Sequence, residues 1–325
     1  MQRQPFEPAN LDAGIKTFLD DLTESGSVGF DSAPVEEMRA LFVELATHLD
    51  APNAELEAVS DHQAPGPDGE ITVRLYVPKN ARPNGGALVF FHGGGWVIGN
   101  LQTHDSMCRR LANHGGVKVI SVDYRLAPEH KYPAAIDDAI AAYTWVCGEA
   151  EFFDIDRKQI AVGGDSAGGA LAAIVSNELA KTDLRPAMQV LIYPVTQIIG
   201  ATLSRAVLAD GYFLSANDIK FFGEQYLSEP GQALLPKVSP ILHPDLSNVP
   251  PALIVTAGFD PLCDEGLAYA EKLRWAGVGV EEIHAPSLIH GFANLTALSP
   301  AALSAVEDTA QRMGKALKRQ SRSKG

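Results

Sequence analysis

The feature that most constrains the fold is an alternation of short apolar runs with helical patterns after about residue 70. Five of the runs are almost continuously apolar, as parallel strands buried on both faces are: residues 87–91, 117–124, 159–163, 188–193 and 252–258. A sixth run, ITVRLYV at 71–77, alternates apolar and polar residues, which is typical of a half-buried edge strand. We therefore predict one mostly parallel, doubly wound sheet with helices on both faces.

Helical patterns fill the intervals between these runs. The pattern at 133–146 starts with Pro133, which suits the first turn of a helix, and the pattern at 265–277 ends on a glycine suited to the position after a helix. After Gly169, apolar residues recur at helical spacing: Leu171, Ile174, Val175 and Leu179. The succession of strands and helices thus extends over most of the chain.

Two regions depart from this alternation. Residues 1–50 contain two amphipathic helix patterns, and the second places its apolar residues on one stripe: Val35, Met38, Leu41, Phe42, Leu45 and Leu49. Residues 195–235 are rich in aromatic residues and have a helical pattern, for example in the segment GYFLSANDIKFFGEQYL. These regions are either peripheral packing or a cap over a site in the main unit, residues 51–325, into which the second region is inserted.

Charge and composition exclude several classes of partner. The chain has 26 basic and 40 acidic residues and a net charge of −14, which argues against binding to nucleic acid. No apolar stretch approaches the length of a membrane span, and the first ten residues lack the apolar core of a signal peptide. We therefore expect a cytoplasmic globular protein. The basic stretch KALKRQSRSKG at the end is expected to be a solvated, frayed terminus.

The three cysteines do not suggest a structural or metal role. Cys108, Cys147 and Cys263 are odd in number and far apart, with no C-x-x-C spacing. They fit neither a disulfide framework nor a zinc site. We expect buried free thiols in a reducing compartment.

The pentapeptide GDSAG at 164–168 fits the G-x-S-x-G pattern of a nucleophile elbow. It follows a strand pattern and precedes a helix pattern, so Ser166 is placed on a sharp turn whose flanking glycines relieve crowding. The amide of Ala167 and the helix N-terminus then point toward an anion forming on a substrate. A phosphate-binding loop is the alternative, but no lysine follows and the glycine spacing fits neither phosphate motif.

A second glycine run, HGGGW at 92–96, comes directly after the strand pattern at 87–91. Consecutive glycines allow backbone amides to approach a ligand closely. We expect Gly93, Gly94 and Gly95, together with Ala167, to supply an oxyanion hole, in which each donor is worth about 3 kcal/mol of transition-state stabilisation. The alternative is a glycine-rich loop that arose by chance. Chance does not readily explain why HGGGW occurs together with GDSAG and in this order.

A serine nucleophile requires a base and an orienting carboxylate. In α/β hydrolases these follow in the order Ser, acid, His, each after a strand. Asp260 follows the strand pattern at 252–258, and His290 follows a strand-like run at 278–284. Asp264 and Glu265 are weaker candidates because they look like acids in the first turn of a helix. His284 looks like a packed structural histidine, and His243 lies outside the alternation of strands and helices.

The motifs HGGGW, GDSAGG, GFDPLCDEG and HGF, in this order, resemble those of the hormone-sensitive-lipase family of α/β-hydrolase esterases. Residues 124–135, YRLAPEHKYPAA, are similar to another signature of that family. The resemblance covers about residues 70–295. It implies an α/β-hydrolase fold in which residues 1–50 and about 195–235 form a helical cap bounding the acyl pocket.

The same resemblance implies roles for individual residues. Ser166 would be the nucleophile, His290 the base and Asp260 the acid, with no metal or organic cofactor. Arg125 and Glu129 would belong to a buried polar network. For Asp165 we favour a structural hydrogen bond over a catalytic role.

The expected function is hydrolysis of short- to medium-chain carboxylic esters of small molecules through an acyl-enzyme. Lactone, acetyl-sugar or amide hydrolysis, or a carboxylesterase-like dehydration, would use the same triad, because pocket shape selects the leaving group. A non-catalytic small-molecule receptor is a further alternative from a different class. The oligomeric state stays open, with a homodimer formed through an exposed sheet edge as one arrangement.

Overall fold

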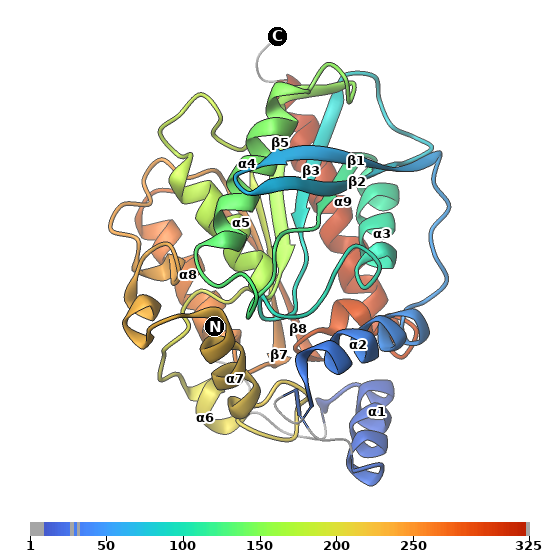
Figure 1. Cartoon of the computed structure of the whole chain (residues 1–325). Coiled ribbons are helices and arrows are strands. Elements are labelled where there is room, and N and C mark those ends of the chain that lie inside the picture. The colour runs from blue at the N-terminus through green and yellow to red at the C-terminus, as the bar shows by residue number, and fades with distance from the viewer. Residues whose placement is uncertain (1–9, 27–28, 31–32, 323–325) are drawn as a thin grey trace.

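The computed structural model describes residues 10–26, 29–30 and 33–322, with side chains as far as residue 319. Within this part of the chain, eight strands form one sheet in the order β1-β2-β4-β3-β5-β6-β7-β8 (Figure 1). The first two strands run antiparallel to their neighbours and all other pairs are parallel. The strands are β1 Ala58–Gly66, β2 Gly69–Val77, β3 Gly85–Phe91, β4 Lys118–Val122, β5 Ile155–Asp165, β6 Gln189–Ile192, β7 Ala252–Phe259 and β8 Val280–Ile289.

Helices cover both faces of the sheet. One face packs against α4 (Ala134–Gly148), α5 (Ala167–Glu178) and α8 (Cys263–Trp275). The other face packs against α3 (Asp105–Gly115) and α9 (Pro300–Arg322). Because successive side chains of a strand point to opposite faces, each central strand is apolar at almost every position. The sheet is therefore the shared wall between two hydrophobic cores.

Strand β3 illustrates how the two cores are built. Val89 and Phe91 lie in the core with α4, α5 and α8, whereas Leu88 and Phe90 lie in the core with α3 and α9. All four side chains are 0% exposed. A fully buried Leu or Phe contributes about 1.5–3 kcal/mol relative to exposure, so this strand holds the centre of the sheet in one register.

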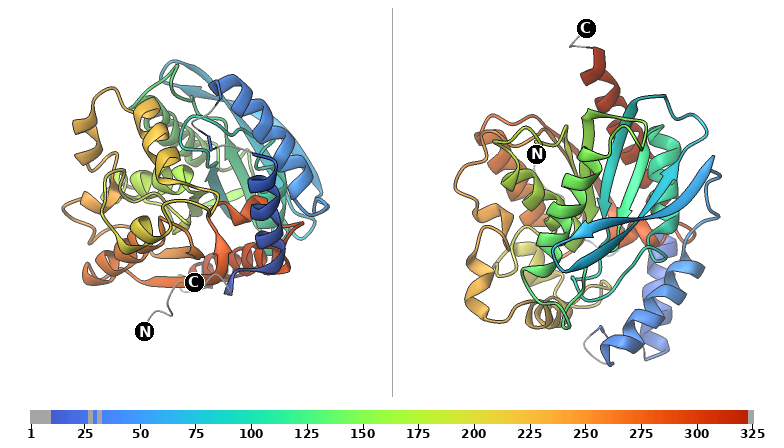
Figure 2. Two further views of the ribbon diagram at one scale, coloured as in Figure 1. Left: turned by 90° about the horizontal axis from the view of Figure 1, so that it is seen from below. Right: turned by 45° about the horizontal axis from the view of Figure 1, so that its top comes forward.

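Four helices cover the carboxyl ends of the strands. They come from two separate parts of the chain: α1 (Ala13–Glu24) and α2 (Val35–Leu49), and α6 (Leu203–Val207) and α7 (Ala216–Tyr226). Seen from below, the blue α1 and α2 lie on one side of the strand ends and the yellow α6 and α7 on the other (Figure 2, left). Short 3-10 helices complete the fold: η2 (Pro230–Leu234), η3 (Pro240–Leu242) and η4 (Phe292–Asn294).

The structure confirms the mostly parallel sheet with helices on both faces and corrects several details. Strand β2, predicted from the alternation at 71–77 as an edge strand, lies one place inside the sheet, and the edge on that side is β1. Along α2, Leu41 is 54% exposed and leaves the predicted apolar stripe. Helix α5 is buried along nearly its whole length, because its Gly and Ala residues let it pack closely on every side.

The carboxyl-terminal end also differs from the expectation. The predicted frayed stretch begins inside α9, which continues to Arg322 and buries Met313 and Leu317 against the sheet. Residues 323–325 and 1–9 lie outside the described part, so the expectations for them stay as stated. The three cysteines, all within the described residues, are buried and not joined by disulfide bonds, as expected.

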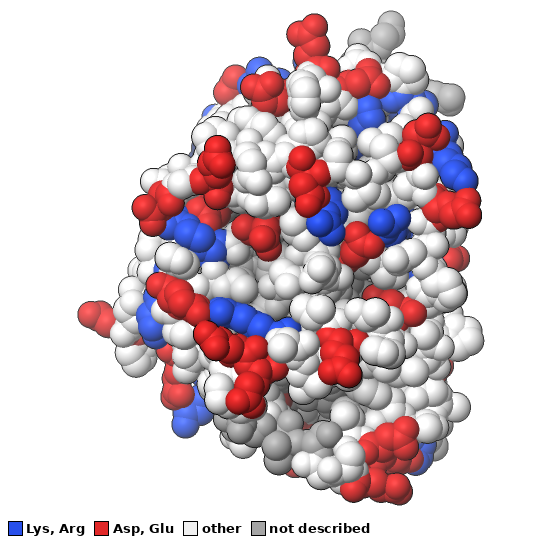
Figure 3. All heavy atoms as spheres, turned by 45° about the vertical axis from the view of Figure 1, so that its right-hand side comes forward, with Lys and Arg blue, Asp and Glu red and all other residues white. Residues whose placement is uncertain are grey.

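The surface charge follows from the composition of the chain. Acidic side chains are spread over the face shown in Figure 3, in keeping with the net charge of −14. Among the described residues, none of the helices combines the length and apolar character needed to cross a bilayer.

Candidate active site

Ser166 lies on the sharp turn between β5 and α5. Its backbone has φ 54° and ψ −117°, a conformation that non-glycine residues rarely adopt. The turn is tight, because a Cβ at Gly164 or at Gly168 would collide with the carbonyl oxygen of Phe91. The glycines on either side of the serine therefore let β3 and the turn approach each other. This is the geometry of a nucleophile elbow.

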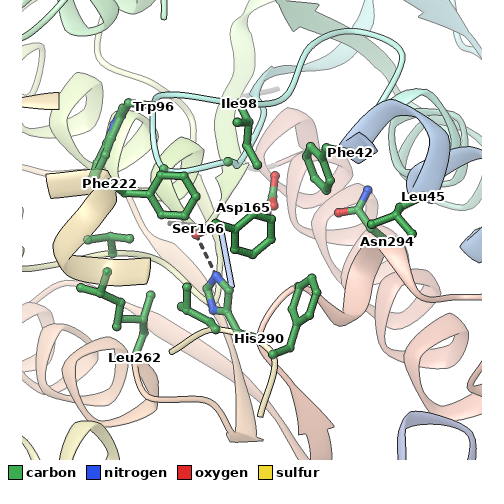
Figure 4. Close-up of a pocket in the computed structure, with 18 of the residues that line it drawn as sticks. Phe42, Leu45, Trp96, Ile98, Asp165, Ser166, Phe222, Leu262, His290 and Asn294 are labelled. Carbon is green, nitrogen blue, oxygen red and sulfur yellow. Dashed lines mark hydrogen bonds between the residues drawn. The ribbon is translucent and has the colours of Figure 1, made fainter. Parts of the chain in front are cut away.

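The structure brings the predicted serine, histidine and aspartate together (Figure 4). His290 Nε2 lies 2.8 Å from Ser166 Oγ, and His290 Nδ1 lies 2.9 Å from Asp260 Oδ2. Asp260 is 0% exposed, and its other oxygen accepts the amide of Leu262 at 2.7 Å. Because a carboxylate only accepts hydrogen bonds, Nδ1 carries the proton and Nε2 accepts from the serine hydroxyl. The histidine is thus poised as a base.

Strand ends set these positions. Asp260 directly follows β7, and His290 directly follows β8. Since β5, β7 and β8 belong to the parallel part of one sheet, their carboxyl ends meet at the same edge. Residues 94 and 124 positions after Ser166 in sequence therefore come into hydrogen-bond contact.

The HGGGW run turns beside Ser166 with two glycines at positive φ, Gly94 at 112° and Gly95 at 61°. A side chain at Gly94 would strike the backbone of Ile98, and one at Gly95 would strike the ring of Phe222. Both residues line the same cavity as Ser166. Ala167 begins α5, so its amide is one of the unpaired donors at that helix N-terminus.

Gly93 departs from the expectation for the oxyanion hole. Its amide donates to Asp165 Oδ1 at 2.8 Å, so it is not available to an oxyanion. The backbone amides that remain as expected donors to an oxyanion are those of Gly94, Gly95 and Ala167. The same contact assigns Asp165 the structural hydrogen bond that the sequence favoured, since it holds the start of the glycine run against the nucleophile turn.

The environment of Asp165 keeps it ionised. Burial opposes its charge, but the neighbouring His104, whose Nε2 lies 3.2 Å from Oδ1, and the Gly93 amide hold the pKa of Asp165 below its usual value. Burial also lowers the pKa of His92 to about 3, so this ring is neutral. It stacks on Tyr124 with centroids 4.3 Å apart.

The weaker acid candidates have structural roles beside the site. Asp264 accepts the amide of Ser204 at 2.7 Å. Glu265 is 0% exposed, accepts the amide of Thr196 at 2.9 Å and pairs with Arg205 at 2.7 Å. Burial raises the pKa of Glu265 to about 7, with Arg205 opposing the shift. Both acids therefore fasten the start of the 195–235 region to α8.

The weaker histidine candidates lie away from the nucleophile. His284 is exposed on β8 rather than packed in the core, and its Nδ1 lies 3.0 Å from Thr256 Oγ1. His243 Nδ1 accepts the amide of Asp245. Neither ring lines the cavity at Ser166.

A largely apolar cavity opens onto Ser166 and His290. Its walls come from the glycine run, from the chain after β7 and β8, and from the helices that cover the strand ends. The apolar side chains include Phe30, Phe42, Leu45, Leu49, Ile98, Val195, Phe213, Phe222, Leu262 and Leu295. A cavity of this kind suits the hydrocarbon part of a small ligand.

Several polar contacts fasten the covering helices. Asp218, 0% exposed, accepts the amide of Phe30 at 2.7 Å and so joins α7 to the chain before α2. Arg39 of α2 forms two hydrogen bonds to Glu129, each at 2.8 Å. This pairing lowers the pKa of Glu129 to about 2. A third contact lies at the end of α2, where Asp50 Oδ1 accepts from Thr296 Oγ1 at 2.7 Å.

These contacts correct the role expected for the YRLAPE segment. Arg125 does pair with the buried Asp138, at 2.7 Å. The side chain of Glu129 is instead 50% exposed and serves α2 rather than a buried network. The sequence could not indicate this pairing, because its partner Arg39 lies 90 positions earlier.

Comparison with known proteins identifies the family. The profile of a family described as alpha/beta hydrolase fold matches residues 88–294. The chain belongs to the α/β-hydrolase fold family. Carboxylic ester hydrolase LipN of Mycobacterium tuberculosis is 45% identical over 249 residues, which are 73% of this chain and 65% of that protein. Carboxylesterase NlhH of the same species is 40% identical over 92% of this chain and 95% of its own length.

Two further comparisons cover most of the chain. Ethyl acetate hydrolase of Pseudomonas putida is 41% identical over 79% of this chain and 82% of its own. Among solved structures, ester hydrolase EH1AB1 from a Lake Arreo metagenome has a TM-score of 0.90 and 42% identity, covering 94% of this chain and 98% of that one. These relatives confirm the predicted α/β-hydrolase fold and the resemblance to hormone-sensitive-lipase-like carboxylesterases.

Proposed function

We propose that this protein hydrolyses carboxylic esters of small molecules, with Ser166 as nucleophile, His290 as general base and Asp260 as the orienting acid. The observation that carries the proposal is the continuous hydrogen-bond chain from Ser166 Oγ through His290 to the fully buried Asp260, at 2.8 and 2.9 Å. The names of the relatives support an ester as the substrate.

The reaction begins when His290 takes the proton of Ser166 and the serine oxygen attacks the acyl carbon. The carbonyl oxygen becomes an anion, which the amides of Gly94, Gly95 and Ala167 stabilise. Asp260 stabilises the imidazolium without itself taking the proton. His290 then protonates the departing alcohol, and an acyl-enzyme remains.

Water completes the cycle through the same groups. His290 removes a proton from a water molecule that attacks the acyl carbon, and Ser166 leaves with the proton returned to it. Because the cavity at Ser166 is lined mainly by apolar side chains, among them Phe222, it should exclude bulk water around the developing charge and strengthen each hydrogen bond there. Side chains, backbone amides and water supply every step.

We also propose that residues 1–50 and about 195–235 act as a cap on the catalytic unit, residues 51–325. The placement of Phe42 and Leu45 on one wall and Phe222 on another supports this division. Because the cap forms most of the apolar wall, it should limit the acyl chain to short or medium length.

Initial rates on nitrophenyl esters test the proposal. We expect wild-type protein to hydrolyse nitrophenyl butyrate and Ser166→Ala to lose activity by a factor of about 10⁴ or more. Equal rates for the two proteins would remove Ser166 from the mechanism. A higher rate on long-chain than on butyryl esters would instead contradict the role assigned to the cap.

Location and assembly remain proposals of the same kind. The three buried cysteines form no disulfide bond among the described residues, which suits a reducing, cytoplasmic environment. Strand β8 forms one edge of the sheet and could pair with a second copy in a homodimer. Analytical ultracentrifugation would test the dimer directly.

A further inference from the structure

Asn294, on η4, presents a hydrogen-bond acceptor to the active-site cavity. Its Nδ2 donates to the carbonyl oxygen of Thr103 at 2.8 Å. Because a carbonyl oxygen only accepts, this contact fixes which end of the amide is which. The residue is 7% exposed and lines the cavity. In the described part of the chain, no residue donates a hydrogen bond to its oxygen.

Asp165 presents a second acceptor to the same cavity. Its Oδ1 is engaged by the amide of Gly93 and by His104. Its Oδ2 receives no hydrogen bond from the residues that the structure describes, although the side chain is only 3% exposed and lines the cavity. A carboxylate oxygen that remains ionised is a strong acceptor.

Both acceptors lie at the same end of the cavity. Asn294 is held by the carbonyl of Thr103, and Asp165 contacts the ring of the next residue, His104. The ring of Phe42, on α2, lies 6.1 Å from that of His104. Figure 4 shows Asp165 and Asn294 on the side of Phe42 and Leu45, with the oxygen of Asn294 facing toward Ser166. We call this part of the cavity, beneath α2, the acceptor end.

The surroundings of the acceptor end cannot satisfy these oxygens. The neighbouring wall consists of the apolar side chains Phe42, Leu45 and Leu295. Ser166 and His290 use their polar atoms on each other and on Asp260. A purely hydrocarbon ligand would cover both acceptors and leave them unpaired, which costs free energy. A ligand with a hydroxyl or N–H group would instead supply the missing donor.

We infer that the acceptor end selects esters that carry a hydrogen-bond donor, a hydroxyl or amide N–H group, on the part of the substrate that lies beneath α2. Asn294 is then a specificity-determining residue. The inference rests on the proposed ester hydrolysis, whose triad places the ester carbon at Ser166.

Matched esters test the inference, because a hydroxyl group and a methyl group have similar size. The acyl series compares nitrophenyl β-hydroxybutyrate with nitrophenyl isovalerate, and is repeated with the hydroxyl group on the α carbon, as nitrophenyl 2-hydroxybutyrate against nitrophenyl 2-methylbutyrate. The alcohol series compares hydroxyethyl acetate with propyl acetate, followed by acid release. Each pair gives a ratio of kcat/KM values, hydroxyl over methyl.

Asn294→Leu removes the acceptor while keeping the size of the side chain. In wild-type protein we expect the hydroxyl ester to match or exceed its methyl partner in at least one pair. In the variant that ratio should fall roughly tenfold, the value of one buried hydrogen bond. Leu45→Ala is the matched control, since it enlarges the same end without changing its polarity and should shift both esters of a pair alike.

The outcomes separate the inference from the proposed function. A preference for the methyl ester in every pair would overturn the inference. This comparison uses wild-type protein alone, so it does not depend on whether the variant folds. An unchanged ratio in Asn294→Leu would overturn the role of Asn294. If wild-type protein hydrolyses none of the esters, the proposed function itself fails.

Discussion

The catalytic loops and the helices that cover them are held in different ways. Ser166, Asp260 and His290 sit at the ends of buried strands, where neighbouring backbones fix their positions. The covering helices are held by scattered polar contacts, such as Asp218 with Phe30 and Arg39 with Glu129, and by aromatic packing. The first arrangement fixes the chemistry, whereas the second fixes the shape of the cavity. Substitutions in the catalytic loops should therefore lower kcat, whereas substitutions in the covering helices should raise KM.

Apart from the loss of Ser166 itself, the largest effect is expected at the acid of the triad. Asp260→Asn keeps the size of the side chain but no longer fixes the tautomer of His290, so kcat for nitrophenyl butyrate should fall about 10⁴-fold. KM should change little, because Asp260 does not line the cavity. Steady-state kinetics measures both constants. A tenfold or smaller loss of kcat would show that another group orients His290.

Gly95→Ala tests the contact between the glycine run and Phe222 on α7, where a covering helix meets the catalytic loops. The added Cβ would collide with the ring of Phe222, and φ of 61° disfavours alanine. We expect kcat/KM to fall by about 10²–10³, as for loss of one oxyanion donor.

The double variant Gly95→Ala, Phe222→Ala separates the two causes. If Phe222 displaces the amide of Gly95, removing the ring should restore part of kcat. No recovery would indicate that backbone conformation alone accounts for the loss.

Asp218→Ala should act mainly on KM. It removes the acceptor for the amide of Phe30 and leaves three donors of Phe30 and Ser215 unpaired. Phe30 lines the cavity, so KM should rise several-fold with kcat near the wild-type value. The free energy of unfolding should fall by about 1–3 kcal/mol. Asp20→Ala, which removes an exposed acid of α1, is the control. A loss confined to kcat would contradict the division between loops and cover.

The smallest effect on activity is expected at Asp50, which directly follows α2 and accepts a hydrogen bond from Thr296. Burial raises the pKa of Asp50 from 3.8 to about 6, against the opposing hydrogen bond from Thr296. Because the folded protein holds this proton to higher pH than the unfolded chain, Asp50 should make stability fall as pH rises from about 4 to 6 and then level off.

Asp50→Asn removes that titration while keeping an oxygen for Thr296. Chemical unfolding at several pH values should show the variant gaining about 2 kcal/mol over wild type between pH 4 and 7. Activity should stay nearly constant. A gain that does not depend on pH would contradict the assignment to Asp50.

The two regions also differ in what their sequences reveal. The nucleophile turn, the acid and the base follow strands in a fixed order, so short motifs locate Ser166, Asp260 and His290. The amide of Gly93 could not be assigned in this way, because its partner Asp165 is 72 positions away and the direction of an N–H bond depends on the loop conformation. Motifs identify which residues take part, but not the direction in which each group points.

The sequence predicted that the covering regions are helical, but it did not predict which residues these helices contact. The apolar stripe of α2 follows from its spacing, yet Leu41 is exposed because the packing partners are distant segments. The pairs Arg39 with Glu129 and Glu265 with Arg205 join residues far apart in sequence. Strand β1 was missed because its side chains are mostly exposed and its sequence, AVSDHQAPG, lacks an apolar pattern.

Covalent labelling tests the central claim most directly. A serine-directed phosphonate, followed by peptide mass spectrometry, should modify wild-type protein once, at Ser166, with loss of esterase activity in proportion to labelling. Ser166→Ala should not be labelled, and Asp260→Asn should be labelled much more slowly. An unmodified Ser166 in folded wild-type protein, or labelling of another residue that abolishes activity, would contradict the account.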